Sequence, residues 1–83
     1  MPSKSIDSFL RSTGQKLAGA RRRFEKTQRE LAREAKLSVR YLQSIEAGEV
    51  NLTLFTLLRV AKPLGVHPSA LIPNAREWKW VRK

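Results

Sequence analysis

The sequence predicts an all-α, compact five-helix domain, and three observations support this prediction. Apolar residues recur every three or four positions through most of the chain, which is the period of an amphipathic helix. Residues that favour helix N-termini precede these stretches, and glycine or proline follows several of them. No segment of the first 73 residues alternates between apolar and polar residues as a half-buried strand does. A length of 83 residues suits one such domain.

The first helix is expected over residues 6–24, either as one helix or as two pieces. Glycine inside a helix costs roughly 1 kcal/mol relative to alanine, so Gly14 and Gly19 weaken this stretch. The pattern therefore leaves open a break near Gly14. The predicted inward residues of this helix are Ile6, Phe9, Leu10, Thr13, Leu17, Ala20 and Phe24.

Two short helices are expected next, over residues 27–35 and 38–47. Thr27 and Glu30 form a capping box, in which each side chain satisfies a main-chain N–H of the other residue. Ser38 is a suitable N-cap for the third helix, and the glycine at position 48 suits the left-handed backbone that follows a helix end. Leu42 and Ile45 form the inward stripe of this third helix.

Thr53 is predicted to cap a fourth helix, which ends at Gly65. Pro68 fits the first turn of a fifth helix of one or two turns, which stops at Pro73. The predicted inward stripe of the fourth helix, at positions i, i+3, i+4 and i+7, is Leu54, Leu57, Leu58 and Ala61.

The C-terminal stretch differs from the rest, because Trp78 and Trp80 lie two positions apart with charged residues between and beside them. This period of two favours an edge strand or an ordered arm. Phe55 lies off the main stripe of the fourth helix. Because unburied aromatic residues on a small domain suggest an interaction surface, Phe55, Trp78 and Trp80 are candidates for a dimer or partner surface. The alternative is that the tryptophan tail folds back over its own core.

The charge balance predicts a polyanion as partner. Lys and Arg number 17 against 7 Asp and Glu, which gives a net charge of +10. Nucleic acid is the first candidate, and an anionic membrane surface is a distant one, because the first helix is too weakly apolar for stable insertion. The sequence shows neither the apolar core of a secretory signal nor a stretch near ~18 apolar residues, so a cytoplasmic, nucleoid-associated protein is expected.

The residues that enzymes use are scarce. Cysteine is absent and His67 is the single histidine, so a metal site is not expected and His67 is predicted to cap a helix or to lie at the surface. Five of the seven acidic residues lie on predicted helices with Lys or Arg close by, as solvated surface charges do, and the four glycines form no phosphate-binding loop. We therefore expect no enzymatic activity, no cofactor and no small-molecule substrate.

Two short helices joined by a three-residue turn form a helix-turn-helix arrangement. The chain also contains Thr27-Gln28, Leu31-Ala32, Ile45-Glu46-Ala47-Gly48 and Leu64-Gly65-Val66. With these residues the sequence resembles the Cro/phage-repressor-type (XRE-like) family over about residues 13–72, and within it the controller proteins of restriction–modification systems. The resemblance implies a lambda-repressor-like fold that binds operator DNA as a homodimer. It divides the chain into an N-terminal segment or helix extension (1–12), the DNA-binding domain (13–72) and a basic tail (73–83).

Three positions depart from the family pattern. Glu25 and Lys26 stand where an apolar residue usually precedes the threonine, and Phe24 is a candidate to supply that core contact. Lys36 occupies a turn position that is often glycine, at a cost of about 1 kcal/mol if its backbone is left-handed. Pro63 lies in the last turn of the fourth helix, where its ring would bend that end.

The outward face of the third helix carries the candidate contacts to DNA bases. If Leu42 and Ile45 face inward, helical geometry turns residues 39, 40, 43, 44 and 47 outward. Arg40 can pair with guanine and Gln43 with adenine, each good pair discriminating by ~1–3 kcal/mol, while an apolar side chain can pack on a thymine methyl. The candidate base contacts are Val39, Arg40, Gln43 and Ser44.

Other residues are candidates for contacts to DNA phosphates. The resemblance implies that Gln28 is one, and it pairs Glu46 with Arg21 as a structural ion pair. Tyr41 is as well suited to packing as to a phosphate contact, and the basic residues at the end of the first helix could equally be a solvated helix end. The predicted phosphate contacts are Gln28, Tyr41, Asn51, Arg22, Arg23 and Lys26.

Two functions therefore remain open. The first is a sequence-specific, dimeric regulator of transcription, of repressor or controller type, that binds a pseudo-palindromic operator in double-stranded DNA. The second is the antitoxin of a toxin–antitoxin pair, whose tryptophan tail binds a toxin while the helix-turn-helix regulates its own gene.

Overall fold

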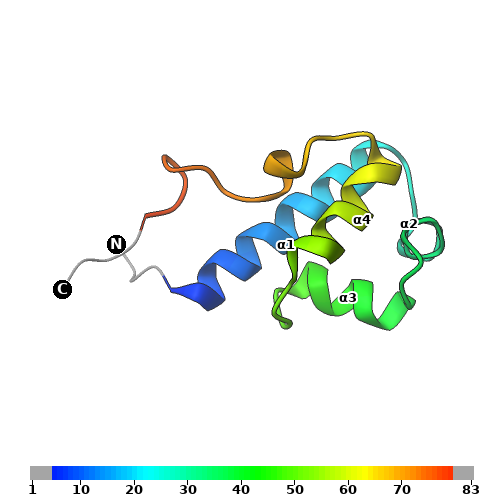
Figure 1. The fold of residues 1–83 in the computed structure, drawn as a ribbon, viewed down its shortest axis with the longest axis horizontal. Coiled ribbons are helices and arrows are strands. Elements are labelled where there is room, and N and C mark those ends of the chain that lie inside the picture. The colour runs from blue at the N-terminus through cyan, green and yellow to red at the C-terminus, as the bar shows by residue number, and fades with distance from the viewer. Residues whose placement is uncertain (1–4, 80–83) are drawn as a thin grey trace.

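The computed structural model describes residues 5–79. They form α1 (Ile6–Arg23), α2 (Gln28–Ala35), α3 (Val39–Ala47), α4 (Leu54–Leu64) and the 3₁₀ helix η1 (Pro68–Leu71), as Figure 1 shows. Within this described part there is no strand, and the all-α prediction is confirmed. The count of five α-helices is wrong, because the last element is a single 3₁₀ turn. Ile72 is already extended (φ −123°, ψ 152°), as the residue before a proline usually is.

α1 is one continuous helix, and Gly14 does not break it. The glycine instead permits close packing of α1 on α3. A Cβ atom added at Gly14 would overlap the main-chain oxygens of Ile45 and Glu46 at the end of α3. α1 also runs without interruption across residue 12, where the sequence suggests a domain boundary, and its N-terminus is capped by Ser5.

The caps of α2 and α3 are those that the sequence predicts, and both helices end within one residue of the expected positions. Thr27 and Glu30 form the full capping box, and the hydroxyl of Ser38 accepts a hydrogen bond of 3.0 Å from the amide of Tyr41. Lys36 is left-handed (φ 60°, ψ 44°), so this turn carries the strain of a non-glycine residue, about 1 kcal/mol.

One core holds all five elements together. The largest fully buried side chains come one from each element: Leu17 in α1, Leu31 in α2, Leu42 in α3, Val60 in α4 and Leu71 in η1. α3 buries Leu42 and Ile45, as its predicted stripe requires. α3 is therefore packed directly on the centre of the domain.

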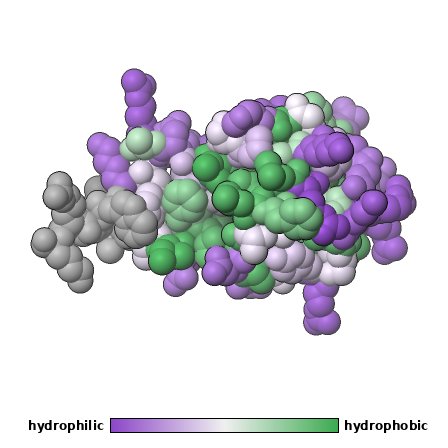
Figure 2. Space-filling view, viewed as in Figure 1, coloured by the Kyte–Doolittle hydropathy of each residue, from purple (hydrophilic) through white to green (hydrophobic). Residues whose placement is uncertain are grey.

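The buried face of α4 differs from the predicted stripe. Leu57 and Ala61 are buried as expected, but Leu54 is 79% exposed and Leu58 is 54% exposed. α4 is apolar around most of its circumference, so its periodicity did not define one inward side. Figure 2 shows apolar side chains gathered over α4 and the N-terminal half of α1 on the viewed face. The buried residues of α4 are Thr56, Leu57, Val60, Ala61 and Leu64.

Phe24 does not supply the core contact expected of it. The residue follows the last residue of α1 with non-helical backbone angles (φ −92°, ψ 12°), and about half of its surface is exposed. The chain turns at once through Glu25, which is left-handed (φ 57°), and this turn leads it into α2. Pro63 lies inside α4, which continues to Leu64 before Gly65 ends it.

The segment after η1 runs back toward the N-terminal end of α1 (Figure 1). Trp78 is 8% exposed, and its ring meets that of Phe9 edge to face with 4.9 Å between centroids. Lys16 in α1 also forms an ion pair of 2.9 Å with Glu77. The expectation that Trp78 belongs to an exposed partner surface is therefore wrong, and Trp80 lies outside the described residues.

Candidate nucleic-acid interface

The exposed face of α3 is polar and lies opposite its buried stripe. Arg40 and Gln43 are exposed, while Val39 and Ser44 are half-buried. Val39 and Tyr41 also pack in part against the hydrophobic core, so Tyr41 has the packing role that the sequence left open. The face thus offers a guanidinium, an amide and a hydroxyl, which are the groups that can pair with base edges in a major groove.

α3 is joined to α1 by an ion pair between Arg21 and Glu46. Nε of Arg21 donates to Oε2 of Glu46 at 2.7 Å, and its second terminal nitrogen donates to Oε1 at 3.1 Å. The side chains are only 12% and 7% exposed. Arg21 also donates to the carbonyl oxygen of Lys26 at 3.0 Å. One guanidinium therefore ties together α1, the loop before α2 and the end of α3.

Gln28, the first residue of α2, connects the Arg21–Glu46 ion pair by hydrogen bonds to Gln43 on the exposed face of α3. Its Nε2 donates to Oε1 of Glu46 at 2.9 Å, and its Oε1 accepts a hydrogen bond of 3.3 Å from Nε2 of Gln43. Sequence reasoning named all four residues but did not connect the glutamines to the ion pair. A polar residue at a helix start that faces the next helix is the signal that could have suggested it.

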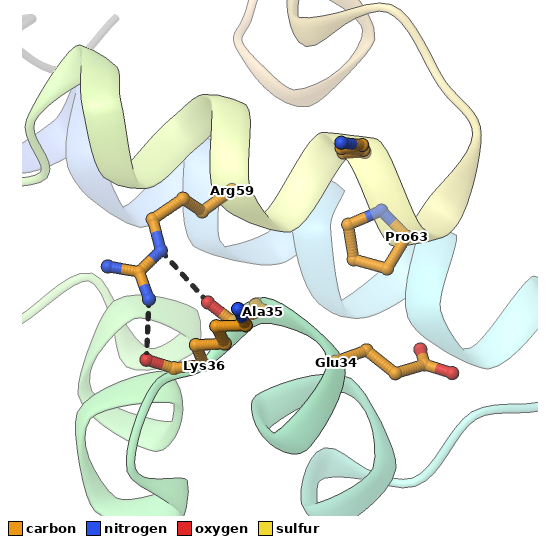
Figure 3. A pocket seen from close by; sticks show the side chains of 6 residues that line it. Glu34, Ala35, Lys36, Arg59 and Pro63 are labelled. Carbon is orange, nitrogen blue, oxygen red and sulfur yellow. Dashed lines mark hydrogen bonds between the residues drawn. The ribbon is translucent and has the colours of Figure 1, made fainter.

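Arg59 is a positioning residue that sequence reasoning missed. From α4, its guanidinium donates to the carbonyl oxygens of Ala35 at 3.0 Å and Lys36 at 2.7 Å, across a shallow groove between α2 and α4 (Figure 3). The same group lies 5.3 Å from the ring centroid of Phe55. Arg59 thus satisfies carbonyl groups at the strained turn between α2 and α3. A lone arginine inside an apolar helix is the signal that could have found it.

Among the other predicted phosphate contacts, three side chains are exposed and one is already engaged in an ion pair. Arg22 and Arg23 are exposed at the C-terminal end of α1, and Asn51 is exposed just before α4. Lys26 instead makes an ion pair with Glu34, with distances of 2.7 and 3.0 Å to its two oxygens. Lys26 would have to exchange this partner for a phosphate.

Two carboxyl groups have lowered pKa values for local reasons. The main-chain N–H of Thr27 donates to Glu30 in the capping box and lowers the pKa of that carboxyl group, with the Thr27 side chain assisting. The ammonium of Lys16 donates to Glu77 and lowers the pKa of Glu77. Both carboxylates stabilise local folding, at the start of α2 and in the returning C-terminal segment.

The single histidine has a structural role in the fold. His67 caps η1 by accepting a hydrogen bond of 3.1 Å from the amide of Ser69. Within residues 5–79, no cluster of three or more His, Cys, Asp or Glu residues could hold a metal ion. None of the helices formed by this part of the chain combines the length and the apolar character needed to span a bilayer.

Both the sequence and the fold have known relatives. The chain matches the sequence model of the helix-turn-helix family HTH_3 over residues 17–71, well over half of its length. This chain belongs to that helix-turn-helix family. It is also similar to the immunity repressor protein of Bacillus phage phi105, with 39% identity over 61 residues. That match covers 74% of this chain and 42% of the repressor, so the chain spans less than half the length of this curated relative.

Solved structures of the same fold include regulators and an enzyme. The restriction-modification controller protein C.AhdI from Aeromonas hydrophila has a TM-score of 0.73 and 31% identity, and the match covers 75% of this chain and 94% of C.AhdI. The clp gene regulator ClgR from Corynebacterium glutamicum has a TM-score of 0.75 and 26% identity, with 84% and 71% covered. Hydroxypropylphosphonic acid epoxidase from S. wedmorenis has a TM-score of 0.77 and 27% identity, with 83% of this chain but 37% of the epoxidase covered.

Proposed function

We propose that this helix-turn-helix protein is a sequence-specific, DNA-binding regulator of transcription, of repressor or controller type. The observation that carries the proposal is the exposed face of α3. This face presents Arg40, Gln43 and Ser44 on a helix whose other side is buried in the core and joined to α1 by the Arg21–Glu46 pair. An α-helix held in this way fits the major groove of B-DNA.

The charge of the chain supports the same function. A net charge of +10 on 83 residues attracts the phosphate backbone of DNA. Arg22, Arg23 and Asn51 are exposed and would supply phosphate contacts beside the base contacts of Val39, Arg40, Gln43 and Ser44. Gln28 would add a phosphate contact through the second N–H of its amide while it keeps its present partners, and Lys26 would add one after it exchanges Glu34 for a phosphate. A regulator of this kind acts where chromosomal DNA lies, so we assign it to the cytoplasm.

The operator would be bound by a homodimer. Leu54, Phe55 and Leu58 form an exposed apolar face on α4, and a second copy of the chain could bury it. Two-fold symmetry would then place two copies of α3 in successive major grooves, about 34 Å apart, and would require a pseudo-palindromic operator.

The antitoxin function receives less support. Its distinguishing feature was a tryptophan tail free to bind a toxin, and Trp78 is buried against Phe9 in this structure. Enzymatic activity is not part of the proposal either. The likeness to the epoxidase covers 37% of that protein, whereas the likeness to C.AhdI covers 94% of the controller protein.

The proposal is tested by gel-shift titrations on the duplex upstream of the protein's own gene and on a scrambled duplex of equal length. We expect preferential binding to the natural duplex and a fall in affinity with salt, with a logarithmic slope of about −0.9 per neutralised phosphate. Arg40→Ala should relax base preference, whereas Arg22→Ala should weaken binding to both duplexes alike. Equal binding of the parent protein to both duplexes would reject sequence-specific regulation.

A further inference from the structure

A chain of hydrogen bonds leads from the ion pair between α1 and α3 to the exposed face of α3. Arg21 donates to both carboxylate oxygens of Glu46, and Oε1 of Glu46 also accepts from Nε2 of Gln28 at 2.9 Å. Oε1 of Gln28 then accepts from Nε2 of Gln43 at 3.3 Å. A nearly buried carboxylate is thereby connected to an amide at the surface of the molecule.

The direction of every bond in this chain follows from the ion pair. A guanidinium only donates hydrogen bonds and an ionised carboxylate only accepts them. Gln28 must therefore turn its NH₂ group toward Glu46, which leaves its carbonyl oxygen facing Gln43. Gln43 must then donate through its own NH₂ group. Reversing either amide would place two donors or two acceptors against each other, which costs about 1–3 kcal/mol for an unsatisfied polar group.

This polarity determines what Gln43 can offer to a ligand. One N–H of Gln43 is used by Gln28, so its carbonyl oxygen and its second N–H remain for an outside partner. In the major groove, adenine presents a donor at N6 beside an acceptor at N7, which matches this pair of groups. Guanine presents two acceptors, O6 and N7, so the carbonyl oxygen of Gln43 would meet O6.

We propose that the Arg21–Glu46–Gln28 chain orients the amide of Gln43 so that it selects adenine over guanine at the base pair it contacts. The inference rests on the proposed function, since it requires α3 to enter the major groove. Gln28 is then a positioning residue, which acts on the base through Gln43. A well-formed bidentate pair discriminates by ~1–3 kcal/mol, which corresponds to about a 5- to 150-fold preference.

Gln28→Met separates the orientation of the Gln43 amide by Gln28 from a direct phosphate contact made by Gln28. Methionine has nearly the length of glutamine and a similar helix propensity, but it offers Gln43 no hydrogen-bond acceptor of comparable strength. The terminal torsion of Gln43 would then be free to turn by half a rotation and to direct NH₂ at O6 of guanine. Loss of a phosphate contact at position 28 would weaken all duplexes equally and leave the ratio of affinities unchanged.

The experiment first selects preferred duplexes from a randomised library and finds the base pair whose preference Gln43→Ala abolishes. Fluorescence anisotropy then gives the affinities for two duplexes with A·T or G·C at that position. We expect the parent to prefer adenine about 5- to 150-fold. Gln28→Met should reduce this ratio at that position alone, since a freely turning amide can donate one hydrogen bond to guanine but still makes two to adenine. Gln15→Met is the matched control, because Gln15 is an exposed glutamine of α1 outside the hydrogen-bond chain.

A second measurement needs no DNA. The ¹⁵N side-chain amide signal of Gln43 should move toward that of a free glutamine in Gln28→Met, while thermal unfolding shows that the variant is folded. An unchanged affinity ratio, a parent preference for guanine, or an unmoved Gln43 signal would each overturn the proposal. A parent protein that prefers no sequence at all would instead overturn the proposed function on which it rests.

Discussion

The outward faces of α3 and α4 differ although both helices pack on the same core. α3 presents polar groups, and its end is held by the ion pair of Arg21 and Glu46, with Gln28 adding a further bond. α4 presents Leu54, Phe55 and Leu58, and leaves them exposed. The comparison indicates that hydrogen bonds within the domain orient the polar face, whereas no residue of the described chain covers the apolar face.

The largest expected effect comes from breaking the ion pair that orients the α3 face. Glu46→Ala leaves Arg21 charged, largely buried and without this carboxylate, so we expect the free energy of unfolding to fall by about 3 kcal/mol. Urea denaturation followed by circular dichroism measures this change. The double variant Arg21→Met/Glu46→Met should recover most of the stability, and a double variant no more stable than Glu46→Ala would contradict the assignment.

The close contact between α1 and α3 can be tested with two glycines of one helix. Gly14→Ala should reduce stability by about 2 kcal/mol, because its new methyl group meets the main chain of Ile45 and Glu46. Gly19→Ala should increase stability by roughly 0.5–1 kcal/mol, since a Cβ there meets nothing within 4 Å and alanine favours the helix. Thermal and urea unfolding measure the change in stability of each variant. A change of the same sign in both variants would refute the close approach of α1 and α3 at Gly14.

The α4 face should affect association rather than folding. Leu58→Ser removes apolar surface that is exposed in the single chain, so we expect its stability as a monomer to change by less than ~0.5 kcal/mol. If the face joins two copies, dimerisation should weaken by about tenfold or more, which is 1.4 kcal/mol. Sedimentation equilibrium measures the populations of monomer and dimer. Lys62→Ser, at another exposed position of α4, is the control. An unchanged dimer constant would place the interface elsewhere.

The smallest effect concerns the capping box at the start of α2. The pKa of Glu30 is lowered in the folded protein, so its contribution to stability is present above the value for an unfolded chain, about 4.3, and is lost as pH falls through the lower folded value. Glu30→Gln should therefore show a smaller drop in melting temperature between neutral pH and pH ~3 than the parent. Equal drops in the two proteins would show that Glu30 does not contribute.

Local signals predicted α2 and α3 well. Thr27, Glu30 and Ser38 act on amides within three residues, so their effect can be recognised from sequence alone. Leu42 and Ile45 were also placed correctly, since polar residues surround them on a short helix. Helical periodicity is therefore enough to identify the residues on the exposed face of α3, whereas the contacts of this face to DNA stay predictions.

Apart from the Arg21–Glu46 pair, which the family resemblance implied, features that depend on distant residues were not predicted. The inward side of α4 is chosen by what it packs against, because Leu54 and Leu58 are as apolar as Leu57. Arg59 is explained only by the carbonyl groups of the α2–α3 turn, which lie 23 and 24 positions earlier in the chain. Trp78 packs against Phe9, which lies near the other end of the described chain. Periodicity carries no information about such pairings.

The core has a practical consequence for attempts to shorten this protein. Each of the five elements supplies one fully buried side chain to the same centre. A peptide covering only the two helices of the motif would keep Leu31 and Leu42 but would lack the three remaining contributors, and isolated helices of eight and nine residues are marginal in water. The two helices of the motif are therefore not expected to fold by themselves, and the surface side chains of α3 would have to be grafted onto a complete domain.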